Sequence, residues 1–285
     1  MSQRQLSTRK IVNVAGIALI VALSLLALSP LISVLYYVVA HGWRALSLDF
    51  FTKLPLPVGE TGGGIGHAIL GSIILVVMAS IISVPIGLGM GVLLSEYRHL
   101  RISRLLGSVV DLLASIPSIV IGLFAYAIVV KPFHGFSAHA GAIALSIVMI
   151  PIVARTTEEM LKLVSQTVRE AGLALGLPRY RMILRIVVKG SLGPILVGVI
   201  LAVARIAGET APLLFTAFSS QQWFQGLSQP IASIPVQIYN YAISPYDDWH
   251  EKAWGGALIL ILMVLGLNLS IRLFLARKNQ TRSRS

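Results

Sequence analysis

The sequence predicts an all-α, polytopic membrane protein with six transmembrane helices. Of its 285 residues, 56% are hydrophobic and only 12% are charged, whereas a soluble domain is usually about a quarter charged. A spanning helix needs about 20 mainly apolar residues. Six such runs occur, at 12–40, 67–95, 105–130, 139–161, 190–218 and 254–275.

The basic residues predict the orientation of these spans. With the N-terminus inside, and with Arg155 and Arg272 counted at the cytoplasmic ends of their spans, eighteen of the 23 Lys and Arg residues fall on the cytoplasmic side and four outside, which leaves Arg205 within a span. Cytoplasmic loops are enriched in Lys and Arg, so both termini are predicted to be cytoplasmic. Topology therefore accounts for the net charge of +12, and we expect no nucleic-acid partner.

The first apolar run is longer than the core of a signal peptide, about 7–15 residues, and is interpreted as a retained anchor. We divide the chain into three parts. Residues 1–66 form a cytoplasmic head, the first span and an extracytoplasmic connector. Residues 67–275 form a five-span core with a long cytoplasmic segment at 162–189, and residues 276–285 form a basic cytoplasmic tail.

Several chemistries are excluded. The chain has no cysteine, so disulfides and thiol catalysis are impossible, and its six scattered histidines lack the spacing of a metal site. "TGGGIG" at 61–66 lacks the Lys-Ser/Thr of a phosphate-binding P-loop and is interpreted as a flexible lead-in to the second span. We expect no catalytic residue, no metal and no cofactor in this chain.

The third span contains "SIPSIV", in which Pro117 should bend the helix. Ser115 and Ser118 either present hydroxyls to a transport pathway or serve ordinary helix packing. Asp111, near the start of this span, is expected to pair with a nearby base or to face a partner subunit.

The cytoplasmic segment 162–189 is too long and too apolar for a solvated loop. Ser165 suits the start of one short helix, Gly176 suits a left-handed helix end and Pro178 the start of a second helix. Two short helices with an apolar face are therefore predicted. Either another protein covers that face, or the segment lies on the lipid interface.

"ARIAGETAPLLF" at 204–215 places two opposite charges inside a span. An arginine at the centre of a spanning helix costs about 2.5–3.5 kcal/mol. Arg205 and Glu209 are four residues apart and share a helix face, so they either form a structural ion pair or line a water-filled pathway. Gly208 and Pro212 predict a break in the helix beside them.

An anion pathway would use Arg205 to hold an oxyanion bidentately, with Glu209 competing for the guanidinium during release. Arg155 has two interpretations, as a residue that anchors a helix end or as the inner exit of the pathway.

"EAGLALG", followed after nine residues by Ile186, resembles the EAA loop of the permease subunits of ABC importers. The match covers Glu170, Ala171, Gly176 and Ile186. The chain departs from the pattern at Gly172, which is usually Ala, and at 188–189, where the family has Leu-Pro. Further stretches resemble permeases of the phosphate-specific transport system over roughly residues 60–275: "GGGIGHAILGS", "EY", "SIPSIVIGLF", "PIVARTTEEMLKLV", "REAGLALGLPRYRM" and "ARIAGETAPLLF".

This resemblance implies a MetI-like ABC importer permease fold and a multi-pass location in the bacterial inner membrane. It implies a non-catalytic subunit that forms half of the pathway of an ATP-driven importer of inorganic phosphate. The implied pathway residues are Arg205, Glu209, Arg155, Thr210, Ser115 and Ser118. The implied ATPase-coupling residues are Glu170, Ala171, Gly172, Ala174, Leu175 and Gly176.

The partners implied are a homologous permease subunit (PstC-like), a cytoplasmic ATPase dimer (PstB-like) and an extracytoplasmic phosphate-binding protein (PstS-like), within membrane lipid. ATP and Mg would be bound by the ATPase. Two alternatives stay open: a permease for another tetrahedral oxyanion such as sulfate or molybdate, and a non-transporting membrane scaffold or sensor subunit. An ion-coupled secondary transporter is disfavoured because no inverted repeat is visible.

Overall fold

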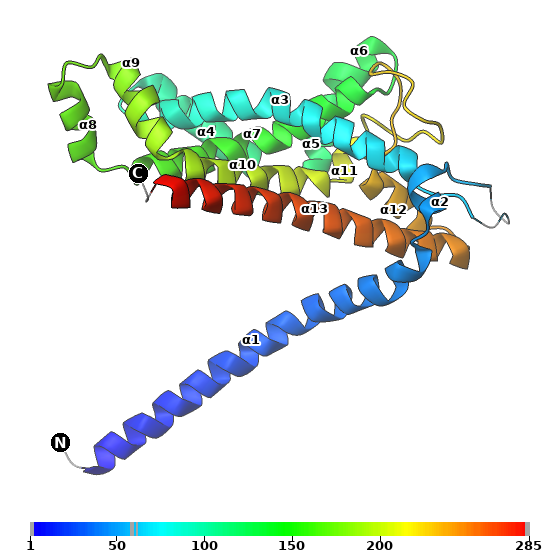
Figure 1. Ribbon diagram of the computed structural model, residues 1–285, viewed down its shortest axis with the longest axis horizontal. Coiled ribbons are helices and arrows are strands. Elements are labelled where there is room, and N and C mark those ends of the chain that lie inside the picture. Colours follow the sequence, from blue (N-terminus) through cyan, green and yellow to red (C-terminus); the bar gives the residue numbers. More distant parts are fainter. Residues whose placement is uncertain (1–2, 58–59, 61, 283–285) are drawn as a thin grey trace.

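The computed structural model describes residues 3–57, 60 and 62–282, and within these ranges the chain is helical with no strand (Figure 1). Among the described residues, four helices are long and apolar enough to cross a membrane: α1 (Gln3–Ala45), α3 (Gly66–Glu96), α7 (Ala138–Lys162) and α13 (Asp247–Arg282). α13 thus continues beyond the predicted span 254–275.

Two further spans are bent. α4 (Arg101–Ser115) meets α5 (Ser118–Ala125) at 106°, and α5 continues through the π-helical segment η1 (Tyr126–Val130) into α6 (Lys131–Phe133). α9 (Arg179–Met182) and the π-helical segment η2 (Ile183–Val188) meet α10 (Leu192–Ala207) at 72°. With each bent pair counted as one span, the part of the chain that the structure describes has up to six spans, in agreement with the prediction.

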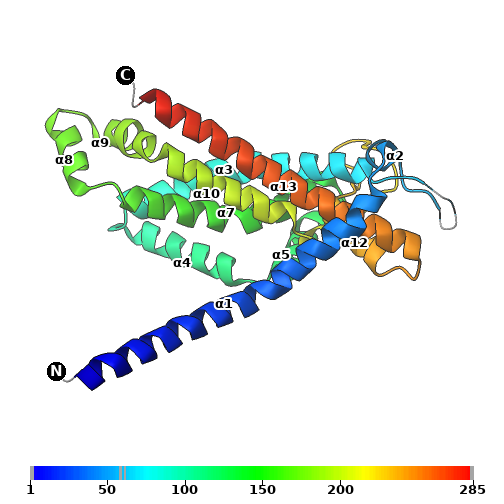
Figure 2. The same ribbon diagram turned by 60° about the horizontal axis from the view of Figure 1, so that its bottom comes forward.

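The two ends of the bundle differ. α3, α7, α10 and α13 lie side by side (Figures 1 and 2). Both termini lie toward the end that carries α8 (Gln166–Ala174) and α9, whereas α2 (Leu48–Thr52), α6 and α12 (Ile234–Ala242) lie at the other end (Figure 1). This arrangement agrees with six spans and with termini on the same side as the segment predicted to be cytoplasmic.

α3 and α7 form the centre of the bundle, and their contact depends on glycines. A Cβ added at Gly87 would lie 2.7 Å from Val153 Cβ, and one at Gly91 would lie 2.5 Å from Thr157 Cβ. Small residues let the backbones of membrane helices approach closely. The two helices are therefore in tight contact along their cytoplasmic halves.

α1 is the predicted first span, but most of it leaves the bundle (Figure 1). Side chains from Val12 to Tyr37 are almost all exposed, whereas Val38 and Gly42 are buried. A Cβ at Gly42 would lie 2.6 Å from Trp254 O, so α1 is held on α13 near its C-terminal end.

The glycine-rich segment before α3 was interpreted from the sequence as a flexible lead-in, and the structure corrects this. A Cβ at Gly64 would lie 2.3 Å from Asp49 O, and one at Gly66 would lie 2.3 Å from Phe51 O. These two glycines therefore allow the chain to pack against α2, and close packing rather than flexibility explains them. Thr61, the first residue of the lead-in, lies outside the described residues.

Candidate functional site

The predicted break beside Arg205 is present. α10 ends at Ala207, Gly208 follows as its C-cap, and the chain is non-helical until α11 (Ala211–Leu214) begins. The amide of Glu209 donates to Ile206 O at 3.2 Å, which closes the last turn. Arg205, Glu209 and Thr210 are thus brought together where a helix stops inside the bundle.

The two charged side chains at this break differ in exposure and form only a long ion pair. Arg205 Nε lies 3.8 Å from Glu209 Oε1, which is too long for a hydrogen bond. The side chain of Arg205 is 62% exposed and that of Glu209 only 14%. The guanidinium therefore makes one loose ion pair among the described residues, and its donors remain available.

The two serines of the bent span differ in their relation to this break. α5, which begins at Ser118, packs on α11: a Cβ at Gly122 would lie 2.8 Å from Pro212 Cα. Ser115 lies before the bend, and its hydroxyl donates to Leu112 O at 2.8 Å. The helix carrying Ser118 is therefore beside the break, whereas the Ser115 hydroxyl is already used within α4.

Arg155 lies in a different, fully paired cluster. Its Nη2 is 2.5 Å from Asp111 Oδ1 and its Nη1 is 2.5 Å from Glu158 Oε2, while Nη2 also donates to Gly107 O at 3.1 Å. The expectation that Asp111 pairs with a base is confirmed. The guanidinium ties α4 to α7 and has few donors left for an anion in this arrangement.

The depth of this cluster relative to Arg205 follows from helix packing. Thr156, next to Arg155, packs on Gly198 of α10, where a Cβ would lie 2.7 Å from Thr156 Cβ. Arg205 is seven residues further along α10, or roughly 10 Å at 1.5 Å per residue. Arg155 thus lies about two helical turns closer to the cytoplasmic end than Arg205.

The cytoplasmic segment forms the two predicted short helices, α8 and α9. Ser165 occupies the N-cap position of α8, although its hydroxyl makes no capping hydrogen bond. Gly176 has φ +78°, the predicted left-handed conformation. Pro178 is the N-cap of α9, one position before its first turn.

The predicted coupling residues lie on an open surface. Glu170, Ala171, Ala174, Leu175 and Gly176 are exposed, and Leu175 is 82% exposed. Gly172 is the buried exception.

Gly172 is buried against side chains of the two following segments. A Cβ there would lie 2.8 Å from Ile186 Cδ1 and 2.9 Å from Met182 Cγ. α8 therefore uses Gly172 to pack on α9 and η2, and it leaves the rest of its predicted coupling surface free.

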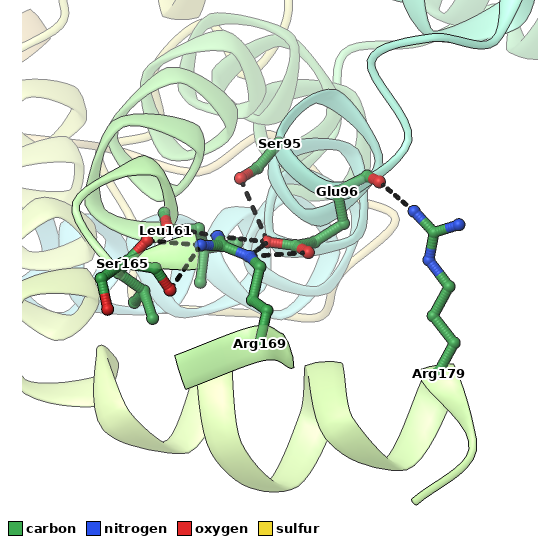
Figure 3. Close-up of polar contacts among 7 residues, drawn as sticks. Ser95, Glu96, Leu161, Ser165, Arg169 and Arg179 are labelled. Carbon is green, nitrogen blue, oxygen red and sulfur yellow. Dashed lines mark hydrogen bonds and ion pairs between the residues drawn. The ribbon is translucent and has the colours of Figure 1, made fainter. Parts of the chain in front are cut away.

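Sequence reasoning missed a buried ion pair beside this surface. Arg169, the neighbour of Glu170, lies 2.7 Å from Glu96 at the end of α3 (Figure 3). From the sequence, Glu96 was noted only as the first residue of "EY", one of the stretches that resemble phosphate-system permeases. Nothing in the sequence indicated that its partner lies 73 residues away.

Comparisons with known proteins show what the chain is similar to. Residues 83–282 match the family described as "Binding-protein-dependent transport system inner membrane component". The phosphate transport system permease protein PstA of Yersinia pestis is 46% identical over 267 residues, covering 93% of this chain and 90% of that protein. Its namesake in Xylella fastidiosa (strain Temecula1) is 43% identical over 278 residues, covering 97% of this chain and 96% of that protein.

A solved structure gives the fold. A chain of the MetNI methionine ABC transporter, in an inward-facing conformation, aligns with a TM-score of 0.63 at 16% identity, covering 74% of this chain and 95% of that chain. The predicted all-helical, MetI-like permease fold and a multi-pass location in the bacterial inner membrane are therefore confirmed. The chain belongs to the family of binding-protein-dependent transport system inner membrane components and, within it, to the phosphate transport system permease proteins.

Proposed function

We propose that this chain is the permease subunit of an ATP-driven importer of inorganic phosphate and forms half of its translocation pathway. The observation that carries this proposal is the 46% identity over 93% of the chain to a phosphate transport permease. The chemistry of the helix break at Arg205 gives independent support.

Arg205 is proposed to bind the anion during passage. An arginine facing lipid near the middle of a span costs about 2.5–3.5 kcal/mol, so its exposed guanidinium needs a polar environment. A homologous permease subunit (PstC-like) packed against this face would provide one, with the pathway between the two subunits. A guanidinium can then hold two phosphate oxygens at once.

Other pathway residues are proposed to assist passage. Glu209 is near enough to take back the guanidinium when the anion leaves, and Thr210 and Ser118 supply hydroxyl donors beside the break. Arg155 would accept the anion nearer the cytoplasm only after its pairs with Asp111 and Glu158 have opened. Ser115 would have to release its bond to Leu112.

The open surface of α8 is proposed to contact a cytoplasmic ATPase dimer (PstB-like), which binds ATP and Mg. This chain contains no P-loop sequence, so hydrolysis is assigned to that partner. An extracytoplasmic phosphate-binding protein (PstS-like) would deliver the anion at the opposite end of the bundle.

The test is uptake of labelled phosphate by cells whose only high-affinity importer contains this chain. Wild type, Arg205→Gln and Arg101→Gln are compared with and without excess sulfate or molybdate. Arg101 is an exposed arginine at the start of α4 and serves as the control.

The proposal predicts uptake that resists both competitors, falls in Arg205→Gln and persists in Arg101→Gln. Transport of sulfate or molybdate instead would identify a permease for another oxyanion. An assembled protein that supports no flux would identify a scaffold or sensor.

A further inference from the structure

The last residue of the spanning helix α3 is a buried carboxylate. The side chain of Glu96 is 4% exposed. A negative charge at a helix C-terminus opposes the helix dipole, and a buried carboxylate is costly unless it is paired and hydrogen-bonded. Glu96 therefore does not stabilise α3 by itself, and its burial depends on a partner.

That partner, Arg169 of α8, joins three elements with one guanidinium (Figure 3). Nε donates to both carboxylate oxygens of Glu96 at 3.2 Å, and Nη2 donates to Glu96 Oε1 at 2.7 Å. Nη2 also donates to Leu161 O at 2.8 Å, and Nη1 donates to Val164 O. The Leu161 carbonyl belongs to the last turn of α7, where carbonyls lack partners within the helix.

The second short helix is attached at the same place. Arg179, the first residue of α9, donates through Nη2 to Glu96 O at 2.8 Å. Its guanidinium carbon lies 4.7 Å from the centre of the Tyr97 ring, within range of a cation–π interaction. We call Glu96, Arg169 and Arg179 the cytoplasmic joint, because they fix the α8–α9 pair to the end of α3.

α8 has few other attachments to the bundle. Gly172 is its one buried residue, and its neighbours there are Met182 and Ile186, which belong to α9 and η2. The joint therefore provides the direct polar connection between α8 and a spanning helix. Since α3 is packed tightly on α7 at Gly87 and Gly91, a force applied at Glu96 acts on both helices.

We propose that Arg169 and Glu96 are positioning residues that transmit a displacement of α8 to α3 and α7 during the transport cycle. This inference rests on the proposed function, because it requires an ATPase that acts on α8. The planar guanidinium is held by the Glu96 carboxylate, by the Leu161 carbonyl of α7 and by the Val164 carbonyl just after that helix, so a shift of α8 is passed to the helix ends. A lysine would keep the charge but lose this fixed orientation.

The test uses the complete transporter, with both permease subunits, the ATPase dimer and the binding protein, in proteoliposomes. Phosphate transported per ATP hydrolysed is measured for wild type, Arg169→Lys, Glu96→Gln and the control Arg101→Gln. Disrupting a coupling residue is expected to lower this ratio between about twofold and thirtyfold, with the ATPase still bound. Arg101→Gln should keep the wild-type ratio.

A covalent link separates transmission from folding. The chain has no cysteine, so Glu96→Cys together with Arg169→Cys, in otherwise cysteine-free subunits, can be joined by a short bifunctional thiol reagent. A cleavable reagent is used. The amount of phosphate transported per ATP hydrolysed should be low before linking, recover after linking and fall again when the linker is cleaved.

Two results would overturn the inference. One is a wild-type ratio of phosphate transported to ATP hydrolysed in both Arg169→Lys and Glu96→Gln. The other is a ratio that stays low after the two cysteines are linked. If wild type hydrolyses ATP but moves no phosphate, the proposed function fails instead, so the two failures are distinguishable.

Discussion

Arg205 and Arg169 each lie close to a glutamate, yet the two regions hold their arginines in opposite ways. Arg205 is 62% exposed and its nitrogen is 3.8 Å from Glu209. Arg169 is 14% exposed and its nitrogen is 2.7 Å from Glu96, with further bonds to backbone carbonyls. One guanidinium has donors to spare, and the other has nearly all of them in use.

The difference fits the two roles proposed for these arginines. A transient anion needs a guanidinium that can be released quickly, so a loose and exposed pair suits the pathway. A mechanical connection needs a side chain that cannot reorient, so a buried guanidinium with several acceptors suits the joint. Arg155 resembles Arg169 more than Arg205, because Asp111 and Glu158 occupy its guanidinium.

The largest expected effect is a loss of stability when the glutamate of the tighter pair is removed, and removing each glutamate in turn tests the comparison. Glu96→Ala leaves Arg169 buried without its carboxylate, and breaking a buried pair costs about 3–5 kcal/mol. Glu209→Ala removes a loose pair to an exposed arginine and should cost about 1 kcal/mol or less. Thermal unfolding of the detergent-solubilised chain measures both, and equal losses would contradict the comparison.

The next effect tests how tightly α3 and α7 are packed against each other. Gly91→Ala places a Cβ 2.5 Å from Thr157 Cβ, and such overpacking costs about 1–3 kcal/mol. Gly89 on the same helix has nothing within 4 Å of an added Cβ, so Gly89→Ala is the matched control and should be neutral or slightly stabilising, because alanine favours a helix over glycine. The same unfolding assay checks this pair, and a Gly91→Ala variant as stable as Gly89→Ala would argue against the tight contact.

A smaller effect is expected around the C-terminal end of α8. Gly176 has φ +78°, so Gly176→Ala should cost roughly 1–2 kcal/mol of backbone strain. Gly172→Ala meets only side-chain atoms of Ile186 and Met182, which can move, and alanine favours a helix by about 0.5–1 kcal/mol over glycine. Gly172→Ala should therefore be close to neutral, and binding of the ATPase to both variants shows whether the coupling surface is kept.

The sequence predicted the fold well because hydropathy identifies apolar spans directly. Pro117 and Gly208 marked real breaks, and Gly176 marked the turn between α8 and α9. The fifth span was predicted at 190–218, but its helix starts at Arg179, bends, and ends at Ala207. Hydropathy reports where a chain is apolar and does not report whether its helix is continuous.

The site was predicted less completely. Charges four residues apart, such as Arg205 and Glu209, can be recognised because helix geometry places them together. Arg155 and Asp111 are 44 residues apart, and Arg169 and Glu96 are 73 apart. Such contacts arise from tertiary packing, so sequence spacing gave only an expected partner for Asp111 and no sign of the joint.

The most direct test of the account is the rate of labelled phosphate transport by the reconstituted transporter carrying Arg205→Gln. A lost charge-assisted hydrogen bond is worth about 1.5–3 kcal/mol, so transport should fall at least about tenfold, at about 1.36 kcal/mol per tenfold in rate. Assembly and binding of the ATPase should be unchanged. A rate equal to that of wild type, in a fully assembled complex, would contradict the assignment of Arg205 to the anion pathway.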